Sequence, residues 1–255
     1  MPYASNDGVS LYYEADGGGK AILCCGDIGL GAWQWGWQHA ALAGPYELLV
    51  GDTRGCGRSD DPPQDCTVET LASDAVELLR EHNVRAAHVV GAGLGGMVAL
   101  ELARTTGRVR SLVLIGTALS GDGYDPEPLF ADPNDSEALQ ESMTAAFSQE
   151  FIDAHPGPVS EMVEWRAAED ADTDSWAKQA AALEEFVIEK PYEITDPALV
   201  VHGSEDTLCA PAQGEQLAAD LPKGDLYEVA AAGHLAHIEA SKDVNDRILG
   251  FLDDG

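Results

Sequence analysis

The sequence predicts an α/β fold in which helices cover both faces of a mostly parallel central sheet. Short apolar runs alternate along the chain with segments of helical periodicity, which is the pattern of strand–helix–strand units. The clearest strand, Leu112–Ile115, is apolar at consecutive positions, and this indicates burial on both faces. The chain has 255 residues, enough to bury one large core.

The expected elements alternate in chain order. Each expected strand is a short apolar run bounded by turn residues, and each expected helix carries apolar residues at helical spacing. The strands are expected at residues 8–14, 21–25, 46–50, 87–90, 111–116, 198–202 and 225–229. The helices are expected at residues 33–42, 68–82, 94–104, 212–221 and 244–252. Thr67 is the expected N-cap of the second helix, and Asn83 marks its end.

Residues 121–191 differ in character from the rest of the chain. Acidic and turn residues dominate there, and the apolar residues come in helical sets, such as Leu139, Met143 and Phe147. We therefore expect a helical cap insertion at 121–191. The core of the fold is then made of residues 1–120 and 192–255.

The formal charge of −31 is extreme, because 45 acidic residues face only 14 Lys and Arg. Nucleic-acid binding is disfavoured, since phosphate contacts need clustered basic residues. At molar salt the Debye length falls to about 3 Å, which screens repulsion between acids. The charge therefore indicates a surface adapted to high salt, in the cytoplasm of a halophile.

Other features of the composition point to the same compartment. No apolar run reaches the length of a membrane span, and the first residues lack a basic and then apolar leader. The five cysteines fit neither a zinc site nor a disulfide framework, so we expect reduced, mostly buried thiols. The sequence makes no prediction of oligomeric state.

The segment Val89–Leu100 resembles a strand, a tight glycine turn and a helix. In the motif Gly-x-Ser-x-Gly, a nucleophilic serine sits at the tip of such a turn. Here the frame Gly91-Ala92-Gly93-Leu94-Gly95 is present, and Gly93 stands where the serine belongs. Three further loops with polar or glycine clusters follow strands, at 25–28, 202–206 and 231–237. In parallel sheets, sites lie at these strand ends.

Four segments of the chain resemble the alpha/beta hydrolase superfamily, and within it the 3-oxoadipate enol-lactonase-like and small-esterase members. The segments are residues 52–59, 95–100, 108–114 and 233–239. The resemblance implies an alpha/beta-hydrolase fold, no cofactor and no metal, and a small apolar ester- or lactone-like ligand. It assigns the catalytic acid to Asp206, the base to His234 and the nucleophile position to Gly93. It also assigns the oxyanion hole to the backbone N–H groups of Leu94 and Asp27.

Three positions depart from the family pattern. Gly93 has no hydroxyl, so no acyl-enzyme can form on it. Cys25 stands where relatives commonly have a histidine, and the carboxylate of Asp27 would oppose a developing oxyanion if it pointed inward. Cys25, Ser59 and Ser204 are not expected to replace the missing serine. Restoring the hydroxyl by Gly93→Ser is expected to raise activity if the pocket is intact.

Three functions are compatible with these residues. The first is a hydrolase that retains Asp206 and His234, with His234 as a general base on water. The second is a pseudoenzyme that binds a small ligand without turnover. The third is a dinucleotide-binding oxidoreductase, because Gly91, Gly93 and Gly96 fit Gly-x-Gly-x-x-Gly. No acidic residue follows about 20 positions later, which counts against the third.

Overall fold

The computed structural model describes residues 2–253 and shows an eight-stranded sheet in the order β1-β2-β4-β3-β5-β6-β7-β8. The strands are β1 (Tyr3–Asn6), β2 (Val9–Gly17), β3 (Ala21–Cys25), β4 (Glu47–Gly51), β5 (Ala87–Ala92), β6 (Val109–Ile115), β7 (Ala198–Gly203) and β8 (Gly224–Val229). Strand β2 pairs antiparallel with β1 on one side and with β4 on the other, and all other pairs are parallel. The predicted fold class is confirmed.

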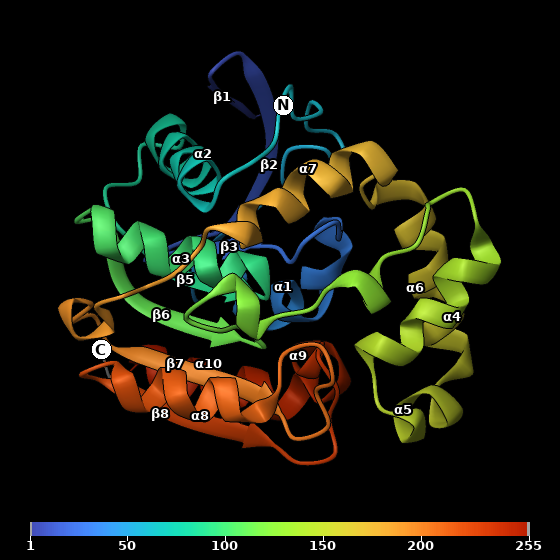
Figure 1. Ribbon diagram of the computed structural model, residues 1–255. Coiled ribbons are helices and arrows are strands. Elements are labelled where there is room, and N and C mark those ends of the chain that lie inside the picture. Colours follow the sequence, from blue (N-terminus) through green and yellow to red (C-terminus); the bar gives the residue numbers. More distant parts are fainter. Residues whose placement is uncertain (1, 254–255) are drawn as a thin grey trace.

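Helices cover both faces of this sheet (Figure 1). The main helices of the core are α1 (Gly36–Leu42), α2 (Val68–Glu81), α3 (Leu94–Thr105), α8 (Pro211–Asp220) and α10 (Ser241–Asp253). Apolar residues of α2, α3 and α8 pack in one buried cluster, and those of α1 and α10 pack in another. The strands between them carry apolar residues to both clusters, which explains why their sequences are apolar at consecutive positions.

The regular elements in the stretch predicted as a cap are all helices, joined by loops. Between β6 and β7 the chain forms η2 (Gly121–Gly123), η3 (Glu127–Leu129), α4 (Ser136–Ala146), α5 (Gln149–Ala154), α6 (Pro156–Glu169), α7 (Thr173–Glu184) and η4 (Pro191–Glu193). Figure 1 shows α4, α5 and α6 together beside the sheet, with α7 leading back across it. The division into a cap at 121–191 and a core stays a prediction.

A local signal marks the start of helix α2, and two short elements were missed because they carry no such signal. The Thr67 side chain accepts a hydrogen bond from the Thr70 N–H, as expected of an N-cap. Strand β1 and helix α9 (Ala236–Glu239) were not predicted, because four residues are too few to show a period. The helix expected at 33–42 begins as a 3₁₀ turn, η1 (Ala32–Trp35), and becomes α-helical only from Gly36.

The register of the central strands sets the place of the candidate site. Cys25, at the end of β3, lies opposite Gly91 of β5. The loop after β3 and the turn after β5 therefore leave the sheet side by side. The loops after β7 and β8 leave from the same edge, because these strands run parallel to β5 and β6.

Candidate active site

The turn between β5 and α3 has the backbone of a nucleophile elbow. Gly93 has φ 48° and ψ −117°, a conformation that strains any residue with a side chain. A Cβ on Gly91 would lie 2.3 Å from the Gly95 carbonyl oxygen, and one on Gly95 would lie 2.1 Å from the Cys25 oxygen. These glycines are therefore explained by close backbone packing in the turn, without a bound dinucleotide.

The side chain of Asp27 fills the space that Gly93 leaves open. A Cβ on Gly93 would lie only 1.8 Å from Asp27 Oδ1. The Asp27 side chain is fully buried. The Asp27 carboxylate and a side chain at position 93 therefore cannot occupy this space together. The two departures from the family pattern, Gly93 and Asp27, thus depend on each other.

Backbone donors hold one oxygen of this carboxylate. Asp27 Oδ1 accepts hydrogen bonds from the Leu94 N–H at 3.0 Å and from the Ile28 N–H at 2.7 Å. The Tyr124 hydroxyl lies 2.9 Å from both Asp27 oxygens. Leu94 is the first residue of α3, so the carboxylate also lies at the positive end of that helix.

One of the two predicted oxyanion-hole donors needs correction. The Leu94 N–H points into the site as expected. The Asp27 N–H does not, because it donates to Gln34 Oε1 at 3.0 Å. The next N–H along the chain, that of Ile28, donates to Asp27 Oδ1 beside the Leu94 N–H. Neither Ile28 nor Tyr124 carried a sequence signal, since an ordinary apolar residue and a cap tyrosine fit no motif.

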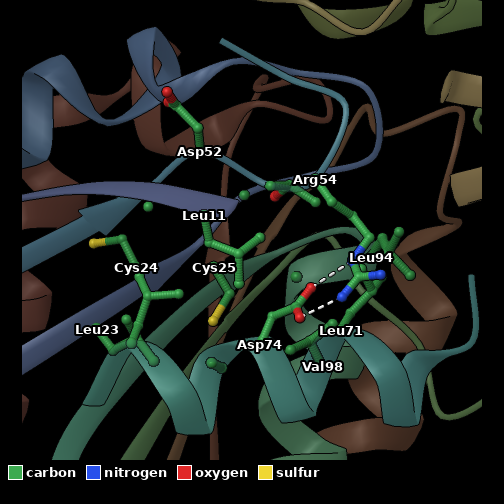
Figure 2. Close-up of a pocket in the computed structure, with 16 residues that line it drawn as sticks. Leu11, Leu23, Cys24, Cys25, Asp52, Arg54, Leu71, Asp74, Leu94 and Val98 are labelled. Atoms are coloured by element: carbon green, nitrogen blue, oxygen red, sulfur yellow. Dashed lines mark hydrogen bonds and ion pairs between the residues drawn. The ribbon is translucent and has the colours of Figure 1, made fainter. Parts of the chain in front are cut away.

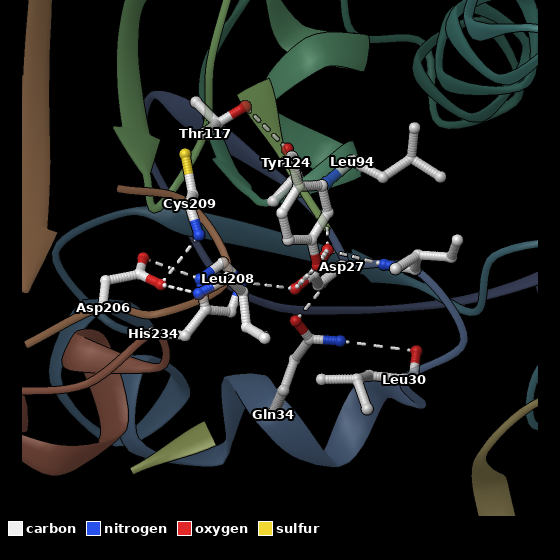
Figure 3. A network of polar contacts seen from close by, with 12 residues as sticks. Asp27, Leu30, Gln34, Leu94, Thr117, Tyr124, Asp206, Leu208, Cys209 and His234 are labelled. Carbon is white, nitrogen blue, oxygen red and sulfur yellow. Dashed lines mark hydrogen bonds and ion pairs between the residues drawn. The ribbon is translucent and has the colours of Figure 1, made fainter. Parts of the chain in front are cut away.

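The structure places Asp206 and His234 next to Asp27. His234 Nδ1 lies 2.8 Å from Asp206 Oδ2, and His234 Nε2 lies 2.9 Å from Asp27 Oδ2. Asp206 follows β7, and its Oδ1 accepts hydrogen bonds from the backbone N–H groups of Leu208 and Cys209. The imidazole is therefore held between two carboxylates (Figure 3).

The charge of these groups follows from their contacts. Burial alone would lower the pKa of His234, but the carboxylates of Asp206 and Asp27 outweigh it and raise that pKa to about 10. Burial opposes ionisation of Asp206 too, yet His234 and the hydrogen bonds at Asp206 hold its pKa well below its usual range. His234 is an imidazolium at neutral pH, with both N–H groups engaged. The resting protein therefore has no free imidazole to act as a base on water.

Loss of this proton is expected to destabilise the fold at alkaline pH. The pKa of His234 is raised in the folded state, so its stabilising contribution is complete below about pH 6.5. The contribution is lost as the pH rises through about 10. We expect urea midpoints to fall between pH 7 and pH 10, and His234→Gln to flatten this decline. A midpoint that falls equally in both proteins would contradict the assignment.

The other candidate nucleophiles do not reach the site. Burial raises the pKa of the Cys25 thiol to about 12, which keeps it uncharged. Ser59 Oγ donates to the Asp52 carbonyl, and Ser204 Oγ accepts from the Ala231 N–H. Both hydroxyls therefore hold loops.

Cys25 instead lines a separate cavity between β3 and helices α2 and α3, next to the ion pair of Arg54 and Asp74 (Figure 2). The volume of this cavity, about 60 Å³, is well below the roughly 300 Å³ of small-molecule sites.

Within residues 2–253, no cluster of three or more His, Cys, Asp or Glu side chains is arranged to hold a metal ion. In the same residues, no helix is both long and apolar enough to cross a membrane.

The fold and the elbow define a hydrolase scaffold, and comparison with known sequences agrees. Residues 21–247 match the alpha/beta hydrolase family, and the chain belongs to that family. It is 26% identical to a putative carbamate hydrolase RutD of Azorhizobium caulinodans, over 98% of each chain. It is also 26% identical to 3-oxoadipate enol-lactonase 1 of Acinetobacter baylyi, over 97% of this chain and 95% of that protein.

Solved structures show the same likeness. The enol-lactonase from Burkholderia xenovorans superimposes with a TM-score of 0.88 at 26% identity, covering 99% of this chain and all of that one. An N-acyl homoserine lactone degrading enzyme gives a TM-score of 0.84 at 26% identity, over 98% of this chain and 100% of the other. The resemblance predicted from the sequence segments is confirmed at the level of the family.

Proposed function

We propose that the chain hydrolyses a small apolar ester- or lactone-like molecule, with the Asp27 carboxylate as nucleophile in place of serine. One observation carries the proposal. The carboxylate occupies the position vacated at Gly93, beside the backbone N–H pair and within hydrogen-bond distance of His234. The names of the relatives support the substrate class, since they include enol-lactonases and a lactone-degrading enzyme.

The charged resting state suits this chemistry. Asp27 Oδ2 attacks an electrophilic carbon and forms an ester or anhydride, while the leaving group takes the His234 proton where it needs one. The lost negative charge at Asp27 then lowers the pKa of His234. Where the leaving group takes no proton, His234 releases its proton to solvent. Neutral His234, still oriented by Asp206, then removes a proton from the water that releases the product.

A second candidate function is supported by the burial of the site. Only 1% of His234 and 4% of Tyr124 is exposed, and the Tyr124 ring stacks on His234 with centroids 5.2 Å apart. A substrate reaches Asp27 only after Tyr124 or its neighbours move. If no such movement occurs, the chain is a pseudoenzyme that binds a small ligand elsewhere. The third function, a dinucleotide-binding oxidoreductase, is not supported. A dinucleotide would place its pyrophosphate at the N-terminus of α3, and the Asp27 carboxylate already occupies that position.

Substitution of Asp27 tests the proposal. Asp27→Asn keeps the shape of the side chain and removes its charge, so hydrolysis of p-nitrophenyl esters and small lactones in molar KCl is expected to fall on the order of a thousand-fold or more. Asp122→Asn is the matched control, because Asp122 is exposed and lies two residues from Tyr124. Full activity in Asp27→Asn would refute the carboxylate nucleophile, and a wild-type protein inactive on every probe would favour the pseudoenzyme.

We also propose that the chain works in the cytoplasm of a halophile. The supporting observation is the excess of 45 acidic over 14 basic residues. Several basic residues are already committed to local ion pairs, among them Arg54 with Asp74 and Arg166 with Asp170. Most acids therefore have no cation near them except those of the solvent.

A further inference from the structure

The two backbone donors of the site are directed at the protein's own carboxylate. In acyl transfer, such donors must be free to bind the oxyanion that forms on the substrate carbonyl. Here the Leu94 and Ile28 N–H groups both bind Asp27 Oδ1, at 3.0 and 2.7 Å. While Asp27 stays in place, a substrate carbonyl oxygen has no access to either donor.

The second oxygen of Asp27 is not held by the backbone and contacts only side chains. Asp27 Oδ2 lies toward His234 Nε2 at 2.9 Å, and neither backbone donor contacts it. When Oδ2 carries a new bond to carbon, Oδ1 becomes the carbonyl oxygen of an Asp27 ester. That oxygen already lies between two donors. Water that attacks Asp27 Cγ would thus form its oxyanion on Oδ1, where the donors are preorganised to stabilise it.

This asymmetry distinguishes two kinds of electrophile. Attack of Oδ2 on an acyl carbon would create an oxyanion on the substrate, and the backbone donors are engaged elsewhere. The two side-chain donors, the Tyr124 hydroxyl and His234 Nε2, also lie 2.9 Å from Asp27 oxygens. Displacement at a saturated carbon creates no oxyanion on the substrate. It needs only a carboxylate nucleophile and a group that leaves with its bonding electrons.

We infer that Asp27 attacks a saturated carbon, and that the substrates are small molecules with a good leaving group on such a carbon. This inference rests on the proposed function and specifies the bond that breaks. In the first step the bond from Oδ2 to carbon forms, and the bond from carbon to the leaving group breaks with its electron pair. In the second step water adds to Asp27 Cγ and the alcohol leaves with the former Oδ2. A strained lactone, cleaved between its ring oxygen and its alkyl carbon, and an alkyl halide both fit this class.

A chiral strained lactone tests the inference with the wild-type protein. (R)-β-butyrolactone gives 3-hydroxybutyrate by either route, but the routes differ in isotope and configuration. In water enriched in ¹⁸O over many turnovers, we expect the label in the hydroxyl group and inversion at the carbinol carbon. Labelling of the carboxylate with retained configuration would overturn the inference. A primary alkyl bromide, which has no acyl carbon, is expected to release bromide.

The variants separate this inference from the proposed function. If the label is found in the carboxylate and Asp27→Asn is inactive, then Asp27 is the nucleophile but does not attack a saturated carbon. If turnover survives Asp27→Asn, the proposed function and the inference are both wrong. If p-nitrophenyl esters react while the lactone and the bromide do not, only the inference is overturned. With the bromide, His234→Gln is expected to accumulate an alkyl ester on the peptide containing Asp27, visible by mass spectrometry. An unmodified peptide in a folded His234→Gln protein would count against the inference.

Discussion

The paired substitution Gly93→Ser with Asp27→Ala is expected to create a serine hydrolase, whereas Gly93→Ser alone is not. The pair removes the carboxylate from the two N–H donors and places a hydroxyl near His234. His234 loses one of its two carboxylates and becomes available as a base. We expect the pair to react with a fluorophosphonate probe and to hydrolyse p-nitrophenyl esters at least about a thousand-fold faster than Asp27→Ala.

The single variants are the controls for this experiment. In Gly93→Ser the new Cβ would lie 1.8 Å from Asp27 Oδ1, so the buried carboxylate must be displaced. Breaking a buried charge pair costs about 3–5 kcal/mol, and we expect a lower melting temperature without probe labelling. The simpler expectation from the sequence, that Gly93→Ser alone restores activity, does not allow for this clash. Efficient labelling of Gly93→Ser alone would show that Asp27 does not hold the site.

In dilute buffer the protein is expected to lose its native structure and to regain it in molar KCl. With a formal charge of −31, repulsion between surface acids acts over about 10 Å at 0.1 M salt and about 3 Å at 1 M. Circular dichroism and the thermal midpoint across a KCl series measure the effect. Sucrose at matched water activity is the control, because it does not screen charge. A thermal midpoint that is the same in dilute buffer and in molar KCl would contradict the adaptation.

The strands were predictable as short apolar runs bounded by turn residues, and the main helices by apolar residues at helical spacing. Residues 21–25 were predicted as a strand and form β3 with the same bounds. The strand ends identified the loops that carry Asp206 and His234, and the family resemblance assigned these two residues. The fold brings them together although they lie 28 positions apart. The short elements β1 and α9 lacked enough residues to show any pattern.

The arrangement of Asp27 was not predictable from its local sequence. The sequence shows an aspartate near the elbow and a missing serine as two separate oddities. Their link is a contact across 67 positions, between the Asp27 side chain and the backbone around Leu94. It depends on the parallel register of β3 and β5, which places the two loops together. Tyr124, which contacts the carboxylate from the predicted cap, depends on tertiary packing in the same way.

A crystal structure of the wild-type protein in high salt tests the central claim most directly. We expect electron density for the Asp27 carboxylate against Gly93, with Oδ1 within hydrogen-bond distance of the Leu94 and Ile28 N–H groups and Oδ2 beside His234. Density for Asp27 turned away from Gly93, with water or an anion between the two N–H groups, would contradict the assignment of Asp27 as the group that replaces serine.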